Sequence, residues 1–133
     1  MRLNVHFGKG HNKVLSNLYP RPFNLTGKSG KTLKFESVEH AYQSLKGGTL
    51  DEVVFKNPRW KSGGLVARGK STKTEGNWNL KLMKRLMKES FKQNPKALAA
   101  LKATGTKEFS HIPASKYWAK EFPIVLSDVR RNL

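Results

Sequence analysis

The stretch NLKLMKRLMKESFKQ at residues 79–93 contains the clearest helical pattern in the chain. On a helical wheel of about 100° per residue, its apolar side chains fill one broad arc and five cations fill the opposite arc. The apolar positions are Leu80, Leu82, Met83, Leu86, Met87 and Phe91. The basic positions are Lys81, Lys84, Arg85, Lys88 and Lys92. The stretch therefore predicts an amphipathic helix with one buried face and one strongly basic face.

Strand and turn signals fill the N-terminal part of the chain. Apolar and polar residues alternate weakly over positions 3–7, and positions 8–12 have the composition of a loop. The segments FNLT at 23–26 and TLKF at 32–35 also alternate, and the glycine-rich GKSGK at 27–31 separates them. Two alternating segments around such a turn predict a β-hairpin.

Further helices are predicted on both sides of the amphipathic one. Their expected starts are Ser37, Thr49 and Pro95, where a capping side chain or a proline suits a helix N-terminus. Gly105 is expected to end the helix that begins at Pro95. Pro123 predicts a break in the C-terminal stretch, because proline removes a backbone donor and clashes with the preceding turn.

The length and the elements together define the expected architecture. A chain of 133 residues has the commonest size of one domain, and no linker, internal repeat or low-complexity tract divides it. We therefore expect a single domain over residues 1–133. Its expected fold class is α+β, predominantly α, with a small N-terminal β-hairpin packed on about five helices.

The net charge is the least ordinary property of the composition, since 26 Lys and Arg against 9 Asp and Glu give +17. Such an excess predicts a polyanionic partner: nucleic acid, a phosphorylated small molecule or an anionic membrane. With no cysteine, the chain cannot form a disulfide scaffold, a cysteine-ligated zinc site or a thiol nucleophile. No apolar run approaches the ~18–20 residues of a membrane span, and the N-terminus lacks a signal peptide's apolar core. We expect an intracellular, cytoplasmic protein with no membrane partner.

Histidines and glycines form no familiar ligand motif. The four histidines, at positions 6, 11, 40 and 111, show no spacing that is typical of a metal site. The glycines form neither a nucleotide phosphate loop nor a dinucleotide fingerprint, and the chain has no nucleophile elbow. We expect no metal and no cofactor.

Acids are scarce, so each of the nine is informative. Glu36 and Glu39 flank the start of the helix expected after Ser37, where acids favour the positive end of the helix dipole. Glu39, Tyr42 and Gln43 also share one helix face by their i, i+3 and i+4 spacing. A carboxylate beside an aromatic ring and an amide predicts a pocket for a polar, planar ligand. Both interpretations, helix stabilisation and ligand binding, fit the residues.

The basic face of residues 79–93 also has two interpretations. A surface helix needs a solvated face, and lysine is a good helix former. A purely solubilising face more often mixes signs, whereas this one carries five cations against the single acid Glu89. The second interpretation is contact with phosphate or nucleic acid, which would supply affinity without sequence preference.

A series of motifs runs in order along most of the chain. The opening signature is LSNLYP at 15–20 with Phe23, followed by FESVEHAYQ at 35–43 with Lys46. The later elements are ARGK at 67–70, Trp78, LM at 82–83, FKQN at 91–94, Leu98, Leu101, TG at 104–105, YW at 117–118 and LSDVR at 126–130. In this order the motifs resemble those of the NADAR superfamily of YbiA-like N-glycosidases. The resemblance spans about residues 15–131, nearly the whole chain.

The resemblance implies a YbiA-like fold and hydrolysis of an N-glycosidic bond between ADP-ribose or a ribose phosphate and a base or amine. It assigns catalysis to Glu39, as acid/base or stabiliser of an oxocarbenium-like sugar, and to Trp78, as a platform that stacks on the base or ribose. Substrate binding is assigned to Asn17, Tyr42, Gln43, Lys46, Lys70 and Trp118, the two lysines holding phosphate.

The chain departs from the family pattern at one catalytic position. The family carries an aspartate shortly before Tyr-Trp-Gly, whereas here Ser115 or Lys116 occupies that position and Ala119 replaces the glycine. A serine is not a general base near neutral pH without help. Glu121 is the candidate substitute carboxylate.

The expected function is an enzyme, an N-glycosidase that acts on an ADP-ribose or ribosyl-phosphate conjugate such as ADP-ribosylated guanine in nucleic acid. The alternative is a catalytically impaired family member that binds nucleic acid or nucleotides through its basic face. A third interpretation is a basic structural or assembly protein, which would show neither turnover nor a defined pocket.

Overall fold

The computed structural model describes the backbone of residues 3–4, 10–27, 29–56, 60–61, 64–65, 76–110 and 116–133. Within these ranges the chain is a mixed α+β structure that is mostly helical, with five α-helices and three short strand pairs. The expected fold class is confirmed at this level. None of the described helices combines the length and the apolar character that a bilayer crossing requires.

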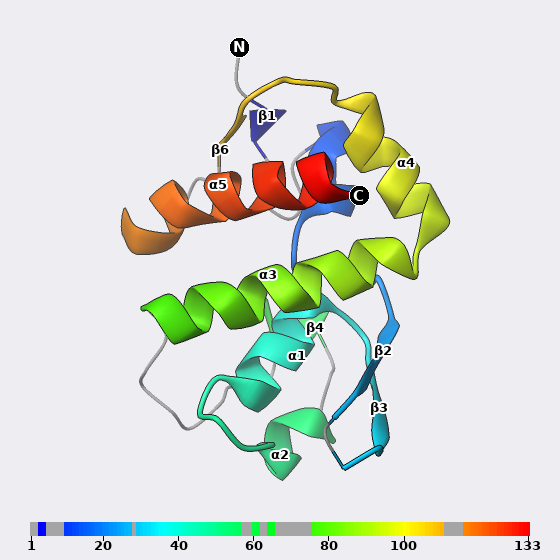
Figure 1. Ribbon diagram of the computed structural model, residues 1–133, viewed down its shortest axis with the longest axis vertical. Helices are drawn as coiled ribbons and strands as arrows, with labels where there is room; N and C mark the ends of the chain where they lie inside the picture. Colours follow the sequence, from blue (N-terminus) through cyan, green and yellow to red (C-terminus); the bar gives the residue numbers. More distant parts are fainter. Residues whose placement is uncertain are drawn as a thin grey trace.

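Helix α3 (Asn77–Lys92) is the centre of the fold and confirms the amphipathic helix expected from the sequence. In Figure 1 it crosses the molecule with α5 (Lys116–Asn132) on one side and α1 (Val38–Leu45) on the other. Helix α4 (Pro95–Ala103) follows it directly, and Pro95 occupies the first turn as expected. Gly105 ends this region with a φ of 62°, a conformation that glycine adopts without strain.

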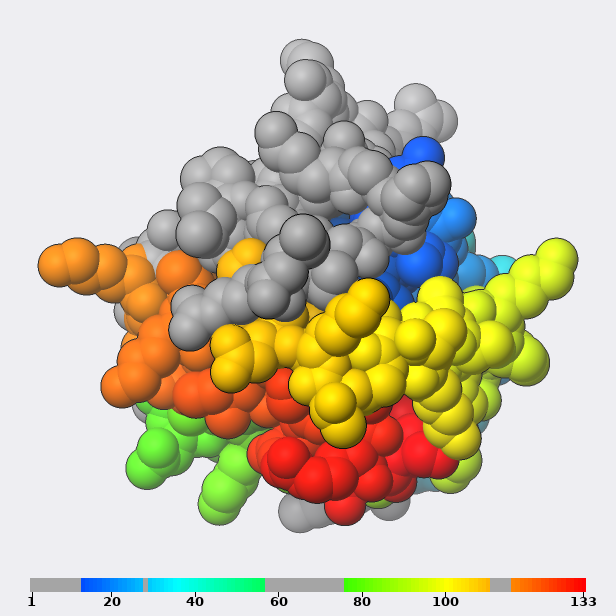
Figure 2. Space-filling model, turned by 90° about the horizontal axis from the view of Figure 1, so that it is seen from above, coloured from blue at the N-terminus to red at the C-terminus, as the bar shows by residue number. Residues whose placement is uncertain are grey.

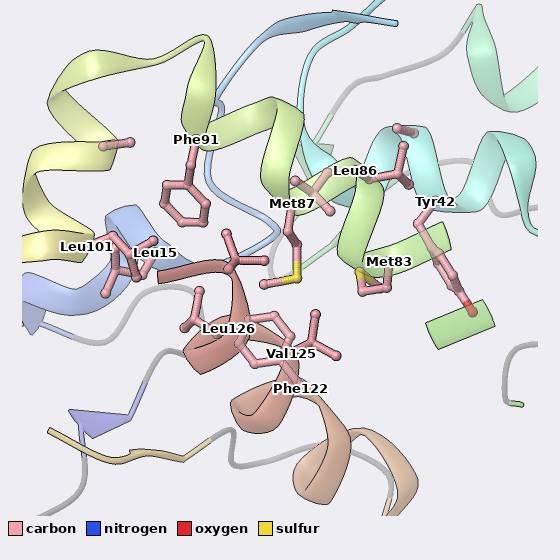
Figure 3. Close-up of a cluster of buried hydrophobic side chains, with 14 of the residues drawn as sticks. Leu15, Tyr42, Met83, Leu86, Met87, Phe91, Leu101, Phe122, Val125 and Leu126 are labelled. Carbon is pink, nitrogen blue, oxygen red and sulfur yellow. The ribbon is translucent and has the colours of Figure 1, made fainter. Parts of the chain in front are cut away.

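The buried face of α3 forms most of the core. Its apolar side chains meet those of α5, with contributions from the N-terminal segment and from α4 (Figure 3). Full burial of each such side chain contributes about 1.5–3 kcal/mol. The residues in contact are Met83, Leu86, Met87 and Phe91 of α3, Phe122, Val125 and Leu126 of α5, Leu15 and Leu101.

The expected β-hairpin is present. Strand β2 (Phe23–Thr26) pairs antiparallel with β3 (Thr32–Phe35) in a register that places Phe23 opposite Phe35. Both rings are buried and their centroids lie 5.9 Å apart. Gly30, in the turn, has a φ of 82°, which few other residues adopt. The hairpin is therefore anchored to the core at its open end.

The expected break at Pro123 is wrong, because α5 continues through it. An interior proline costs about 3 kcal/mol through the lost hydrogen bond and the clash with the preceding turn. The helix buries Phe122, Val125, Leu126 and Val129 on both sides of the proline. Packing of these four side chains offsets the local cost.

The N-terminal expectations have two outcomes. Strand β1 (Leu3–Asn4) pairs in parallel with β6 (Phe109–Ser110), and the rest of the strand expected over 3–7 lies outside the described residues. The expected loop at 8–12 needs a correction, because a 3-10 helix, η1 (Gly10–Leu15), occupies part of it. This helix packs against α4, a contact between distant segments that local composition does not contain.

The remaining elements are short. Helix α2 (Glu52–Phe55) follows α1, and the side chain of Asp51 caps it by accepting from the backbone N–H groups of Val53 and Val54. Strands β4 (Trp60–Lys61) and β5 (Gly64–Leu65) form a second antiparallel pair.

Candidate functional site

The first turn of α1 is fixed by two hydrogen bonds at its N-terminus. Ser37 is the N-cap, as expected, and its Oγ accepts from the backbone N–H of His40 at 3.0 Å. The backbone N–H of Glu39 donates to the Asn17 carbonyl at 3.0 Å. A distant loop thus satisfies a donor that every helix start leaves open. The Ser37 side chain and the Asn17 loop therefore both fix the first turn of α1.

His40 ties the same turn to α2. Its ring is buried, and the backbone N–H of Glu36 donates to Nδ1 at 3.1 Å. Because Nδ1 accepts, the proton lies on Nε2, which donates to the Phe55 carbonyl at 3.0 Å. Burial lowers the pKa of His40 below its ordinary value of 6.5. Its backbone hydrogen bonds, of which the one to Phe55 is the strongest, raise the pKa but do not outweigh the effect of burial. The neutral ring is the form that fits this position, so His40 has a structural role.

The side chain of Glu39 is half-buried and is oriented by Gln43. Gln43 is buried and donates from Nε2 to the Glu39 Oε1 at 2.9 Å. The i, i+4 relation expected from the sequence is therefore a direct contact. It fixes the direction of one carboxylate oxygen.

Asn17 brings a polar group to the same end of α1. Its residue exposure is 6%, and its Nδ2 donates to the Met83 sulfur at 3.2 Å. Its Oδ1 is buried without a hydrogen-bond partner in the part of the chain that the structure describes. A buried acceptor without a partner costs about 1–3 kcal/mol.

Arg21 connects the loop that contains Asn17 to α3. It is fully buried, and its Nη1 donates to the carbonyls of Val14 and Ser16 at 2.7 Å each, while Nε donates to the Ser90 Oγ at 2.9 Å. Its guanidinium also lies 4.1 Å from the centroid of the Phe91 ring. Burial lowers the pKa of Arg21 to about 9. The loop that meets Glu39 is therefore fastened to α3 through one side chain.

Tyr42, which shares a helix face with Glu39 and Gln43, forms an aromatic pair with Trp118 of α5. The Tyr42 hydroxyl accepts from the Asn79 Nδ2 at 3.1 Å, and the Tyr42 ring meets the Trp118 ring edge-on at a centroid distance of 5.8 Å. Tyr117, beside Trp118, binds the backbone N–H and carbonyl of Gly76 through its hydroxyl, at 3.0 and 3.2 Å. The starts of α3 and α5 thus meet α1 at Tyr42.

Of the two lysines assigned to phosphate binding, the structure describes one. Lys46 is the C-cap residue of α1 and only 6% exposed, and its backbone N–H donates to the Tyr42 carbonyl at 2.8 Å. A cation at this position also complements the negative end of the helix dipole. Lys70 lies outside the described residues, as does Ser115.

Trp78 lines a groove to which Glu39 does not contribute. It lies in the first turn of α3, is 44% exposed, and lines a groove of about 400 Å³ between that turn, the hairpin and the end of α1. Glu39 does not line this groove. Asn17 and Gln43 hydrogen-bond to Glu39, and Tyr42 lies one turn from it on α1. Trp78 lines a groove of which Glu39 is not part.

The five cations of α3 are all exposed, as the amphipathic pattern predicts. Two of them have partners. Lys84 forms an ion pair with Asp128 of α5 at 3.6 Å, and Arg85 reaches the Thr26 carbonyl at 3.5 Å. Lys81, Lys88 and Lys92 complete the face.

A further basic hollow of about 560 Å³ lies between the end of α4 and the end of α5, which are side by side in Figure 2. Lys102, Lys107, Arg130 and Arg131 line it together with Glu108. Arg130 donates to the Thr104 Oγ1 at 2.8 Å, and Arg131 forms an ion pair with Asp128. The cations of this hollow are therefore partly engaged by the protein itself.

Among the described side chains, no three His, Asp or Glu residues gather closely enough to hold a metal ion. Three residues that shape the site had no expected role from the sequence: Arg21, Asn79 and Tyr117. The only local signal for Arg21 is its position between two prolines, which holds the backbone extended. Asn79 and Tyr117 contact residues about 40 positions away in sequence, and nothing in the sequence marks those pairs.

No protein-family model, no curated protein and no solved structure matches the chain. The assignment to the NADAR superfamily stays a prediction that rests on the motifs quoted above.

Proposed function

We propose that the protein is an N-glycosidase of the NADAR type that hydrolyses the bond between ADP-ribose, or a ribosyl phosphate, and a nitrogen of a base. The observation that supports this most is the Glu39 carboxylate, fixed by Gln43 and placed by the Asn17 carbonyl at the start of α1. A carboxylate held in one orientation can stabilise an oxocarbenium-like sugar and activate water.

The proposed reaction has one bond made and one broken. The oxygen of water bonds to the anomeric carbon, and the bond from that carbon to the base nitrogen breaks. The electron pair of the broken bond leaves with the nitrogen. A proton of the water passes to the Glu39 carboxylate and from there to the departing nitrogen, so the enzyme returns to its starting state.

The neighbouring side chains have distinct proposed roles. Asn17 is proposed as a polar group of the pocket, and the Tyr42–Trp118 pair would form the apolar wall beside the sugar or base. Lys46, together with Lys70, is proposed to hold phosphate. Lys116 begins α5 where the family has its aspartate region, so Glu121, one turn after Trp118, is the proposed second carboxylate.

The resemblance assigns Trp78 to catalysis, but its groove does not include Glu39. We therefore assign Trp78 to binding of the base part of the substrate and not to the reacting sugar.

The test is incubation of the protein with ADP-ribosylated DNA, ADP-ribosylated RNA and a phosphoribosyl flavin precursor, with Glu39→Gln as control. Chromatographic detection of free ADP-ribose or ribose phosphate, absent with Glu39→Gln, is the expected result. No product from any of these substrates would contradict the proposal.

A second candidate function has its own observation. The exposed cations of α3 form a continuous basic face, which suits a protein that binds nucleic acid without hydrolysing it. Affinity that falls steeply with salt and is unchanged in Glu39→Gln would favour this function when no product forms.

A further inference from the structure

The groove beside Trp78 has the size and lining of a ligand site. Its volume of about 400 Å³ lies within the roughly 300–1,000 Å³ of small-ligand pockets. Leu25 and Leu33 of the hairpin, Leu45 of α1 and Leu82 of α3 form its apolar walls. Three separate elements therefore contribute to one apolar cleft.

Trp78 is the aromatic side chain that this groove presents to solvent. Among the described residues only three large apolar side chains are exposed, Val53, Trp78 and Ile124, and Trp78 is the only aromatic one. An exposed indole at the edge of an apolar cleft offers a planar surface on which a second ring can stack.

The charge of the groove is positive. Lys31 and Arg85 line it, and none of the acidic residues that the structure describes does. Within the described residues Arg85 uses one of its five N–H donors, in a contact of 3.5 Å to the Thr26 carbonyl. The guanidinium therefore keeps donors for an anionic group on the ligand.

The basic face of α3 continues this charge beyond the groove. At about 100° per residue, Lys81, Arg85, Lys88 and Lys92 fall within an arc of about 60°, and Trp78 lies next to that arc. Lys84 lies outside the arc, on the side away from Trp78, and forms an ion pair with Asp128 of α5. A cationic track thus runs along the helix from the groove.

We infer that the Trp78 groove binds single-stranded nucleic acid, with one base stacked on the indole and the flanking phosphates on Arg85 and the α3 lysines. A stacking platform beside a cationic track is the combination that single strands need. In a duplex the base faces are covered by their neighbours, so a duplex could use only the track. The inference extends the proposed function but does not depend on hydrolysis, because binding is measured without turnover.

The test compares two labelled probes of equal length by fluorescence anisotropy at one salt concentration: an oligothymidylate and an abasic oligonucleotide. We expect the wild-type protein to bind oligothymidylate about tenfold or more tightly than the abasic strand, because stacking of one base supplies that difference. Trp78→Ala should lower the affinity for oligothymidylate to that for the abasic strand and leave the latter unchanged. Trp78→Tyr should restore most of the difference.

Two further variants separate stacking from charge. Ile124→Ala removes an exposed apolar side chain elsewhere and should change neither affinity. Arg85→Gln should weaken binding of both probes. Equal wild-type affinity for the two probes would overturn the inference that a base stacks in the Trp78 groove. Binding driven by charge alone would remain compatible with that result. Tighter binding of a duplex of equal length, or no binding of any probe, would also overturn the inference.

Discussion

Gln43 donates a hydrogen bond from Nε2 to the Oε1 of Glu39 at 2.9 Å, one turn apart on α1. Because Gln43 is itself buried, its amide has little freedom to follow a moving carboxylate. The Glu39 carboxylate is therefore held in one orientation. It lies next to a helix N-terminus whose backbone N–H groups donate to Asn17 and Ser37. Orientation of this carboxylate is the structural basis of the proposed chemistry.

The first prediction concerns this contact. Gln43→Met keeps the approximate volume of the side chain but removes the donor to Glu39. A hydrogen bond to a charged group contributes about 1.5–3 kcal/mol, so we expect hydrolysis to slow by about tenfold or more, chiefly in kcat. Steady-state kinetics measure the effect. Unchanged kcat would show that the Gln43 contact does not orient a reacting group.

Arg21 supplies a prediction on stability. It donates to two carbonyls and one hydroxyl in a buried position, and lysine cannot reach all three acceptors. Arg21→Lys should lower the free energy of unfolding by about 2–4 kcal/mol, because buried acceptors lose their partners. Urea unfolding measures this loss. A matched control is Arg85→Lys, at an exposed position, which should unfold like the wild type.

His40 gives the fold a pH dependence. The pKa of its buried ring is lowered, so between that value and about 6.5 the unfolded chain binds more protons than the folded one. The free energy of unfolding should therefore have its full value, as far as His40 is concerned, above about pH 6.5. It should fall as the pH drops below about 6.5, by at most about 1.4 kcal/mol for each pH unit.

Urea unfolding at pH 7.5 and 5.5 tests this dependence. His40→Gln removes the titrating group, so its two unfolding curves should differ less than those of the wild type. The interpretation fails if the wild-type stability is the same at both values, or if His40→Gln retains the full difference.

The basic face of α3 predicts a salt dependence. Each lysine that contacts a phosphate of a single strand adds about 0.7 to the slope of log affinity against log salt concentration. Lys81→Gln with Lys88→Gln should therefore reduce that slope by about 1.4 in total. Lys102→Gln with Lys107→Gln, beside the α4–α5 hollow, removes the same charge elsewhere. An equal change in both double variants would point to net charge and not to the α3 face.

Local patterns were enough to predict part of the fold. The amphipathic α3, the β-hairpin and the Ser37 cap each depend on residues close together in sequence, and all three are confirmed. The Glu39–Gln43 contact belongs to the same group, because i, i+4 spacing within one helix places the two side chains together.

The remaining features depend on packing between distant segments. Pro123 lies inside α5 because apolar side chains on both of its sides are buried, a contribution that local propensity omits. Arg21 contacts Ser90 and Phe91, about 70 positions away. The placement of Trp78 in a groove that Glu39 does not line depends on how α1 and α3 pack against the hairpin, which no motif encodes.

The most direct measurement of the central claim is the release of ADP-ribose from ADP-ribosylated single-stranded DNA by the wild-type protein and by Glu39→Gln. Glu39→Gln keeps the size of the side chain and removes its charge, and circular dichroism establishes that the variant is folded. The account predicts release by the wild type and loss of release, by at least about a hundredfold, in Glu39→Gln, since an acid–base group typically contributes 10²–10⁴-fold. Equal release by the two proteins, or release by neither, would contradict it.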